Sequence, residues 1–164
     1  MRSWLALCAL LAAASPAAAQ SSFDLRILAA HNAERARARV GPLVWDPAIA
    51  AGAKAHADWM ARSGQFAHSD RRTRRGLGEN LWWGGRGAFS PEQMVAMWAA
   101  ERRNFTGGIF PNVSRTGQWF DISHYSQLIW PTTARLGCGF SRGRVDVLVC
   151  RYAPAGNIDG RRVP

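Results

Sequence analysis

Two titratable side chains fall on predicted helix faces that are otherwise apolar. Glu101 lies among residues that recur at helical spacing on one face, namely Met94, Met97, Trp98 and Phe105. His124 shares its face with Leu128 and is flanked by Ile122 and Tyr125. An unpaired carboxylate in such surroundings would cost several kcal/mol, roughly, so we expect a cation, a histidine or a metal beside Glu101. An arginine that neutralises the carboxylate is the simpler structural alternative, and a core histidine held by a hydrogen bond is the corresponding alternative for His124.

Two further residues could do chemistry, although their spacing alone links them to nothing. His68 stands in Phe-Ala-His-Ser and Glu79 in Gly-Glu-Asn-Leu. Histidine and glutamate together supply metal ligands and general acid–base groups. His31, on the first predicted helix, is interpreted separately as a helix-face residue with a local hydrogen bond.

The elements that must position these residues are short and separated by turn signals. Helices are predicted over residues 23–40, 46–64, 90–105 and 121–130. Asp46-Pro47 supplies a cap and a first turn for the second helix, and Ser90-Pro91-Glu92-Gln93 is a capping box for the third. Strands are predicted over residues 79–83 and in a hairpin around Gly143. Helices with a few late, adjacent strands indicate an α+β layered domain.

The cysteines indicate an oxidising compartment. Residues 1–19 have a charge at Arg2, an apolar run and a small-residue cleavage site, which is typical of a secretory leader. Its removal takes Cys8 away and leaves Cys138 and Cys150, which the predicted hairpin would place opposite one another. We expect a disulfide between them, the alternative being two buried free thiols.

Size and charge limit the function further. Removing nineteen of the 164 residues leaves 145, one domain spanning residues 20–164. The net charge of +10 comes almost entirely from arginine and favours anionic partners. Its densest run is Arg71, Arg72, Arg74 and Arg75, which is either a docking patch or a solvated loop. No nucleic-acid-binding module is recognisable, and no stretch is long and apolar enough for a transmembrane protein.

Several motifs occur in an order that resembles the CAP superfamily, named after cysteine-rich secretory proteins, antigen five and pathogenesis-related-one proteins. They begin with His-Asn-Ala-Glu-Arg at 31–35 and Pro-Leu-Val-Trp-Asp at 42–46. Gly-Glu-Asn-Leu at 78–81 and His-Tyr-Ser-Gln-Leu-Ile-Trp at 124–130 resemble two further signatures, and Val-Cys-Arg-Tyr at 149–152 the closing one. The high alanine and arginine content is typical of a bacterial source.

The resemblance implies an α-β-α sandwich with a short antiparallel sheet, and a cleft that gathers His68, Glu79, Glu101 and His124. His68 and His124 would then bind a divalent metal such as zinc, and Glu79 or Glu101 would be the general base if the site hydrolyses a substrate. Alternatively, the four groups only pair with one another and stabilise the cleft. The resemblance also favours a histidine or metal, rather than an arginine, as the partner of Glu101.

The leader and the cysteines predict a secreted protein, extracellular or periplasmic, and we expect a monomer. Three functions are left open. The first is a binding module for a sterol or fatty acid, with groove walls drawn from Trp82, Trp83, Phe89, Phe110, Trp119 and Phe120; the alternative for these aromatics is a place in the core. The second is a zinc-dependent hydrolase at the cell envelope. The third is an interaction protein that docks on anionic surfaces through its arginines. The arginine-rich segment before Glu79 departs from the family pattern, so the cleft rim is expected to select different partners.

Overall fold

The helices begin where the sequence supplies caps. The computed structural model describes residues 21–164, so the predicted leader lies outside the described residues. Helix α1 (Ser22–Arg37) starts with a capping box between Ser21 and Asp24. Helix α2 (Pro47–Ser63) starts at Asp46, whose carboxylate accepts two backbone N–H groups, and stops at Gly64, whose φ of 71° suits glycine.

Helix α3 (Pro91–Ala99) begins with the predicted capping box at Ser90 but is shorter than predicted. A 3₁₀ segment, η2 (Ala100–Asn104), replaces its last turns. The apolar face was also predicted wrongly at Met97, which is 49% exposed and accepts a hydrogen bond from the indole N–H of Trp82. The fourth predicted helix is two short pieces, η3 (Trp119–Ile122) and α4 (Ser123–Leu128).

Three antiparallel strands and one short parallel strand form the main sheet, in the order β1-β4-β5-β2. The hairpin predicted around Gly143 joins β4 (Arg135–Arg142) to β5 (Val145–Ala153), and β2 (Gly78–Gly85) pairs with the other edge of β5. Strand β1 (Val44–Trp45) runs parallel to β4. A separate pair, β3 (Gly108–Ile109) and β6 (Arg162–Val163), and the 3₁₀ turn η1 (Arg71–Thr73) complete the elements.

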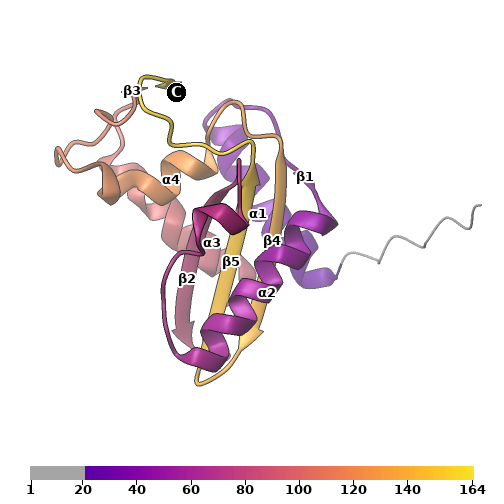
Figure 1. Ribbon diagram of the computed structural model, residues 1–164. Coiled ribbons are helices and arrows are strands. Elements are labelled where there is room, and N and C mark those ends of the chain that lie inside the picture. The colour runs from indigo at the N-terminus through magenta and orange to yellow at the C-terminus, as the bar shows by residue number, and fades with distance from the viewer. Residues whose placement is uncertain (1–20) are drawn as a thin grey trace, which may run out of the picture.

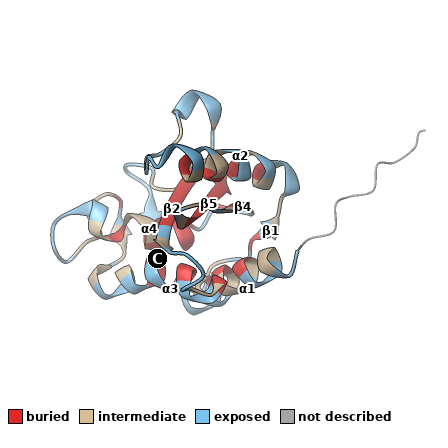
Figure 2. Ribbon diagram, turned by 90° about the horizontal axis from the view of Figure 1, so that it is seen from below, coloured by how far each residue is buried: buried red, intermediate tan, exposed pale blue. Residues whose placement is uncertain are grey.

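The elements stack in three layers, as predicted. Helix α2 covers one face of the sheet, and α1 and α3 cover the other (Figure 2). Helix α2 lies so close to β4 that a Cβ on Gly137 would come within 2.2 Å of a backbone nitrogen of the helix. Helix α4 lies at the end of the sheet where β2 begins (Figure 1). That end carries the site described below.

The predicted disulfide is present. Cys138 and Cys150 face each other across β4 and β5 and are joined by an S–S bond. Within residues 21–164, no helix has the length and apolar character needed to cross a bilayer.

Candidate functional site

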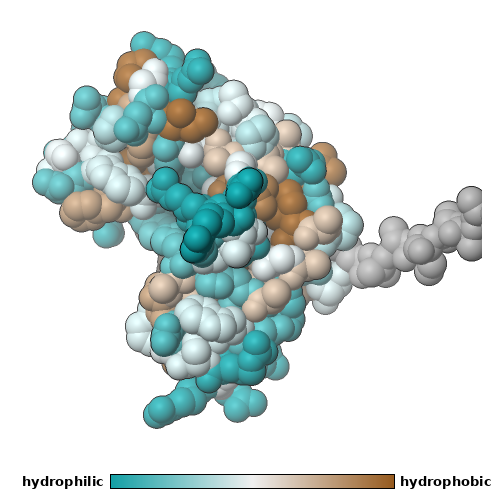
Figure 3. All heavy atoms as spheres, viewed as in Figure 1, coloured by the Kyte–Doolittle hydropathy of each residue, from teal (hydrophilic) through white to brown (hydrophobic). Residues whose placement is uncertain are grey.

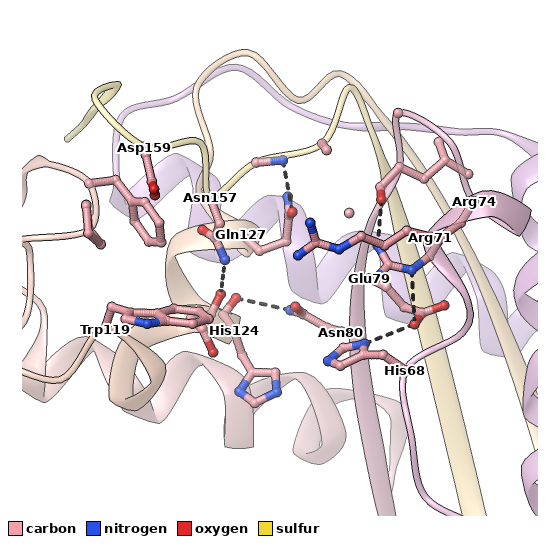
Figure 4. A pocket seen from close by; sticks show the side chains of 18 residues that line it. His68, Arg71, Arg74, Glu79, Asn80, Trp119, His124, Gln127, Asn157 and Asp159 are labelled. Carbon is pink, nitrogen blue, oxygen red and sulfur yellow. Dashed lines mark hydrogen bonds and ion pairs between the residues drawn. The ribbon is translucent and has the colours of Figure 1, made fainter.

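A pocket of about 610 Å³ opens at the end of the sheet, between α4, the start of β2 and the loop that carries η1. Its polar lining includes His68, Glu79, Asn80 and His124, and Arg71 lies across from the two histidines (Figure 4). The imidazole rings of His68 and His124 lie on the same side of the pocket, although their residues are far apart in the sequence.

Glu79 has no exposed side-chain surface and is held by fixed donors. Its carboxylate accepts hydrogen bonds from His68 Nδ1 at 2.9 Å, from the backbone N–H and hydroxyl of Ser69 at 2.9 and 2.7 Å, and from Arg151 Nε at 3.0 Å. Burial alone would raise the pKa of this carboxyl, but the hydrogen bonds outweigh it and lower the pKa to about 2. Glu79 is therefore ionised, and its lone pairs are engaged by the protein.

Glu101 pairs with the second histidine and also caps a helix. One carboxylate oxygen contacts His124 Nδ1 at 2.6 Å. The other accepts the backbone N–H groups of His124 and Tyr125 at 2.9 and 3.0 Å. Helix α4 has no N-cap side chain of its own, so Glu101 satisfies donors that would otherwise be unpaired.

The structure therefore joins the four predicted residues as two histidine–glutamate pairs. His68, Glu79 and His124 line the pocket, whereas Glu101 does not and contributes only through its bonds to His124 and Tyr125. The arginine alternative for Glu101 was wrong, because its partners are the His124 ring and backbone N–H groups. In each pair Nδ1 is bound to the carboxylate, and Nε2 is the ring nitrogen with no partner in the described part of the chain.

These residues offer a metal two imidazole nitrogens. Residues 21–164 contain no group of three or more His, Cys, Asp or Glu placed to hold a metal ion. The histidine–carboxylate pairing is the arrangement that orients metal-binding histidines in proteins. The donor set thus fits a two-histidine site completed by water or a ligand, and not the three protein ligands usual in catalytic zinc sites.

The arginine run is not a uniform patch. Strongly hydrophilic side chains gather over η1 (Figure 3). Arg72 is paired with Asp70 at 2.6 Å, and Arg74 bonds the backbone carbonyls of Ser69 and Leu77. Arg71 and Arg75 make no side-chain hydrogen bond or ion pair within residues 21–164. Only part of the predicted docking charge is therefore available to a partner.

Sequence reasoning missed three residues that hold the site in place. Arg151 stands opposite Glu79 in the β2–β5 register, and that pairing could have been predicted had the register been known. Ser69 directly follows His68 and gives two of the bonds to Glu79. Asn80, next to Glu79, donates to the backbone oxygen of His124 at 3.0 Å and so links the two pairs.

His31 does more than predicted. It makes the expected local bond, to the backbone oxygen of Ile27 at 2.8 Å, and its other nitrogen meets the Tyr152 hydroxyl at 2.9 Å. Burial lowers the pKa of His31 to about 4, so the ring is neutral at pH 7. The Tyr152 hydroxyl also accepts from Asn80 at 3.2 Å, which connects the core to the site.

The aromatic residues proposed as groove walls do not form one groove. Trp82 and Phe110 are buried in the core, whereas Trp83, Trp119 and Phe120 are 58%, 49% and 58% exposed. Of the whole set, only Phe110 and Trp119 line the histidine pocket.

Comparison with known proteins places the chain in a family. The model of the cysteine-rich secretory protein family, CAP, matches residues 28–152. The chain belongs to the CAP family. A pathogenesis-related protein of PR-1 type from Sambucus nigra is 35% identical over 136 residues, covering 81% of this chain and 77% of that protein. Pathogenesis-related leaf protein 6 from Solanum lycopersicum is 36% identical over 137 residues, covering 82% and 79% of the two chains.

Solved CAP structures support the fold. The crystal structure of NaASP2 with Zn²⁺ is similar to this chain with a TM-score of 0.73, covering 91% of this chain and 88% of that one. The two sequences are 23% identical, so the likeness concerns the fold. The chain is thus a CAP-domain protein of pathogenesis-related type.

Proposed function

We propose that this CAP domain is an exported binding module whose cleft holds a ligand without turning it over. The proposal rests on one observation: Glu79 and Glu101 are both engaged by protein donors, while His68 and His124, which line the pocket, each keep one ring nitrogen without a partner in residues 21–164. The family's description as secretory proteins and the Cys138–Cys150 disulfide support export, with residues 1–19 as the leader and 20–164 as the mature domain.

The state of the glutamates argues against the hydrolase. A general base must reach the proton that it takes, and its pKa should lie near the working pH. Glu79 has no exposed side-chain surface, and its pKa of about 2 makes it a weak base. Glu101 is committed to the first turn of α4, so withdrawing it would leave backbone donors unpaired.

The histidines favour binding. His68 and His124 would hold a divalent ion such as zinc through Nε2, with Glu79 and Glu101 fixing the rings from behind. When bound, such an ion would supply positive charge that attracts polar or anionic ligand groups. The mixed polar lining suits such a ligand better than a sterol or fatty acid, which would need an apolar wall.

A zinc titration of the purified mature protein tests the metal site. By calorimetry at pH 7.5, His68→Ala and His124→Ala should each weaken zinc binding by about 10-fold or more, because each removes one of two ligands. His56→Ala is the matched control, since His56 is a partly buried histidine that lies outside the pocket and is bonded to the Ala67 carbonyl. Unchanged zinc affinity in both cleft variants would contradict the proposed metal site.

Assays of ligands and turnover test the rest of the function. If the protein binds labelled sterol or fatty acid saturably, and His68→Ala and His124→Ala leave that binding unchanged, the ligand site lies on a surface other than the cleft. If the protein hydrolyses peptides in the presence of zinc and Glu79→Gln loses this activity, the result would contradict the binding module and support the hydrolase.

A further inference from the structure

Arg71 is an exposed arginine whose charge no described residue neutralises. It lies in η1, and its guanidinium reaches into the histidine pocket toward Gln127 and Asn80 (Figure 4). Its neighbours are engaged elsewhere: Arg72 pairs with Asp70, and Arg74 bonds backbone carbonyls. Of the two arginines that line the pocket, Arg71 is therefore the one whose donors are free.

The carboxylates near Arg71 do not cancel its charge. Glu79 is compensated by Arg151 Nε at 3.0 Å and by Arg74 Nε at 3.6 Å. Asp159 also lines the pocket, but it lies at the opposite side from Arg71 and forms no ion pair with it (Figure 4). Arg71 therefore brings to its side of the pocket a positive charge that no ion pair within residues 21–164 offsets, while Asp159 places a negative charge at the other side.

We propose that the cleft ligand carries an oxyanion, a carboxylate or a phosphate, and that Arg71 binds this group. A planar guanidinium presents parallel N–H donors that match two oxygens of either group. This inference rests on the proposed function, since it names the chemical class of ligand for the same cleft. The oxyanion would lie between Arg71 and the imidazoles of His68 and His124.

The remaining space fits a ligand larger than the oxyanion itself. A cavity of about 610 Å³ lies in the usual range for small-molecule sites. Trp119, which is 49% exposed and packs edge-to-face on Phe110 at 6.0 Å, offers a flat surface at the side away from Arg71. A sugar acid would place its carboxylate at Arg71 and its ring toward Trp119.

Anion binding by matched charge variants tests the inference. The mature protein, without metal, is titrated with sodium glucuronate and with inorganic phosphate, monitored by calorimetry and by the amide and indole NMR signals. Arg71→Gln should weaken binding of the preferred anion by about 10-fold or more, whereas Arg72→Gln removes the same charge from the same turn and should change it by less than about twofold. Stronger binding of glucuronate would indicate a carboxylate ligand, and stronger binding of phosphate a phosphate-bearing one.

Three results would overturn the inference. The first is that neither anion binds. The second is that Arg71→Gln and Arg72→Gln lose equal anion affinity, which would indicate only a general attraction to a basic surface. The third is that the NMR changes are confined to residues outside the pocket. Zinc affinity, measured alone, should not weaken in Arg71→Gln, because this substitution removes no metal ligand and takes a positive charge out of the pocket. A failure of the metal site would appear in the histidine variants and a failure of the anion site in Arg71→Gln, so the two remain distinguishable. Unchanged melting temperatures would show that each variant is folded.

Discussion

Replacing Glu79 by glutamine should remove a pH-dependent part of the protein's stability. The carboxyl has a pKa of about 2 in the folded protein, against an ordinary value of 4.5. That difference corresponds to about 3 kcal/mol of folding free energy, at about 1.4 kcal/mol for each pH unit. Because the folded-state pKa is depressed, this contribution is complete above pH 4.5 and is lost as the pH falls toward 2.

Urea unfolding of the wild type and Glu79→Gln at pH 7, 4.5, 3 and 2, with the disulfide intact, measures this contribution. The free energies of unfolding should differ by about 3 kcal/mol at pH 7, and the difference should shrink to nearly zero at pH 2. Subtracting the two curves removes the titration of all other carboxyls that the variants share.

Glu92 provides the control, because the hydrogen bond from Arg26 also lowers its pKa to about 2 while its side chain is 49% exposed. Solvent and salt screen such a pair, so Glu92→Gln should have a much smaller effect, which added salt reduces further. If the wild type and Glu79→Gln lose stability in parallel between pH 4.5 and 2, the hydrogen bonds to the ionised Glu79 carboxylate do not stabilise the fold.

Three further predictions concern the scaffold and use urea unfolding at pH 7. Changing Cys138 and Cys150 together to serine should cost about 3 kcal/mol, because the open chain gains conformational freedom; an unchanged unfolding midpoint would contradict this. Gly137→Ala should cost more than about 3 kcal/mol, since the new Cβ meets the backbone of α2, whereas Gly41→Ala, with nothing within 4 Å, should have little effect. Arg35→Met should cost at least about 3 kcal/mol, because the buried guanidinium bonds four backbone carbonyls; a loss below about 1 kcal/mol would show that those carbonyls find other partners.

The sequence predicted the elements whose signals are local. The caps at Asp46 and Ser90 mark the starts of α2 and α3, and Gly143 marks the turn between β4 and β5. The end of α3 was misplaced because no capping signal stands near Ala99, and the apolar spacing continues through the 3₁₀ turn that follows. Strand β1 was missed since its two residues are held by pairing with β4, a contact that no local pattern reveals.

The site required information that spacing does not contain. Glu79 follows His68 by eleven residues and Glu101 precedes His124 by 23, and in each pair the two residues stand in different elements or loops. Chain topology creates both pairs, and only the family resemblance indicated that the four residues meet. The bonds from Glu101 to backbone N–H groups of α4 depend on the approach of two elements, so no motif could announce them.

Glu101 bonds both the His124 ring and the backbone of α4, and this affects which defect a natural variant at this position would show first. One side chain both steadies an imidazole and anchors the short segment that carries it, so a mutation there would disturb recognition and structural integrity at once. A host expressing such a variant would show low abundance of the protein, as quality-control proteases removed it, before any defect in ligand recognition could be seen.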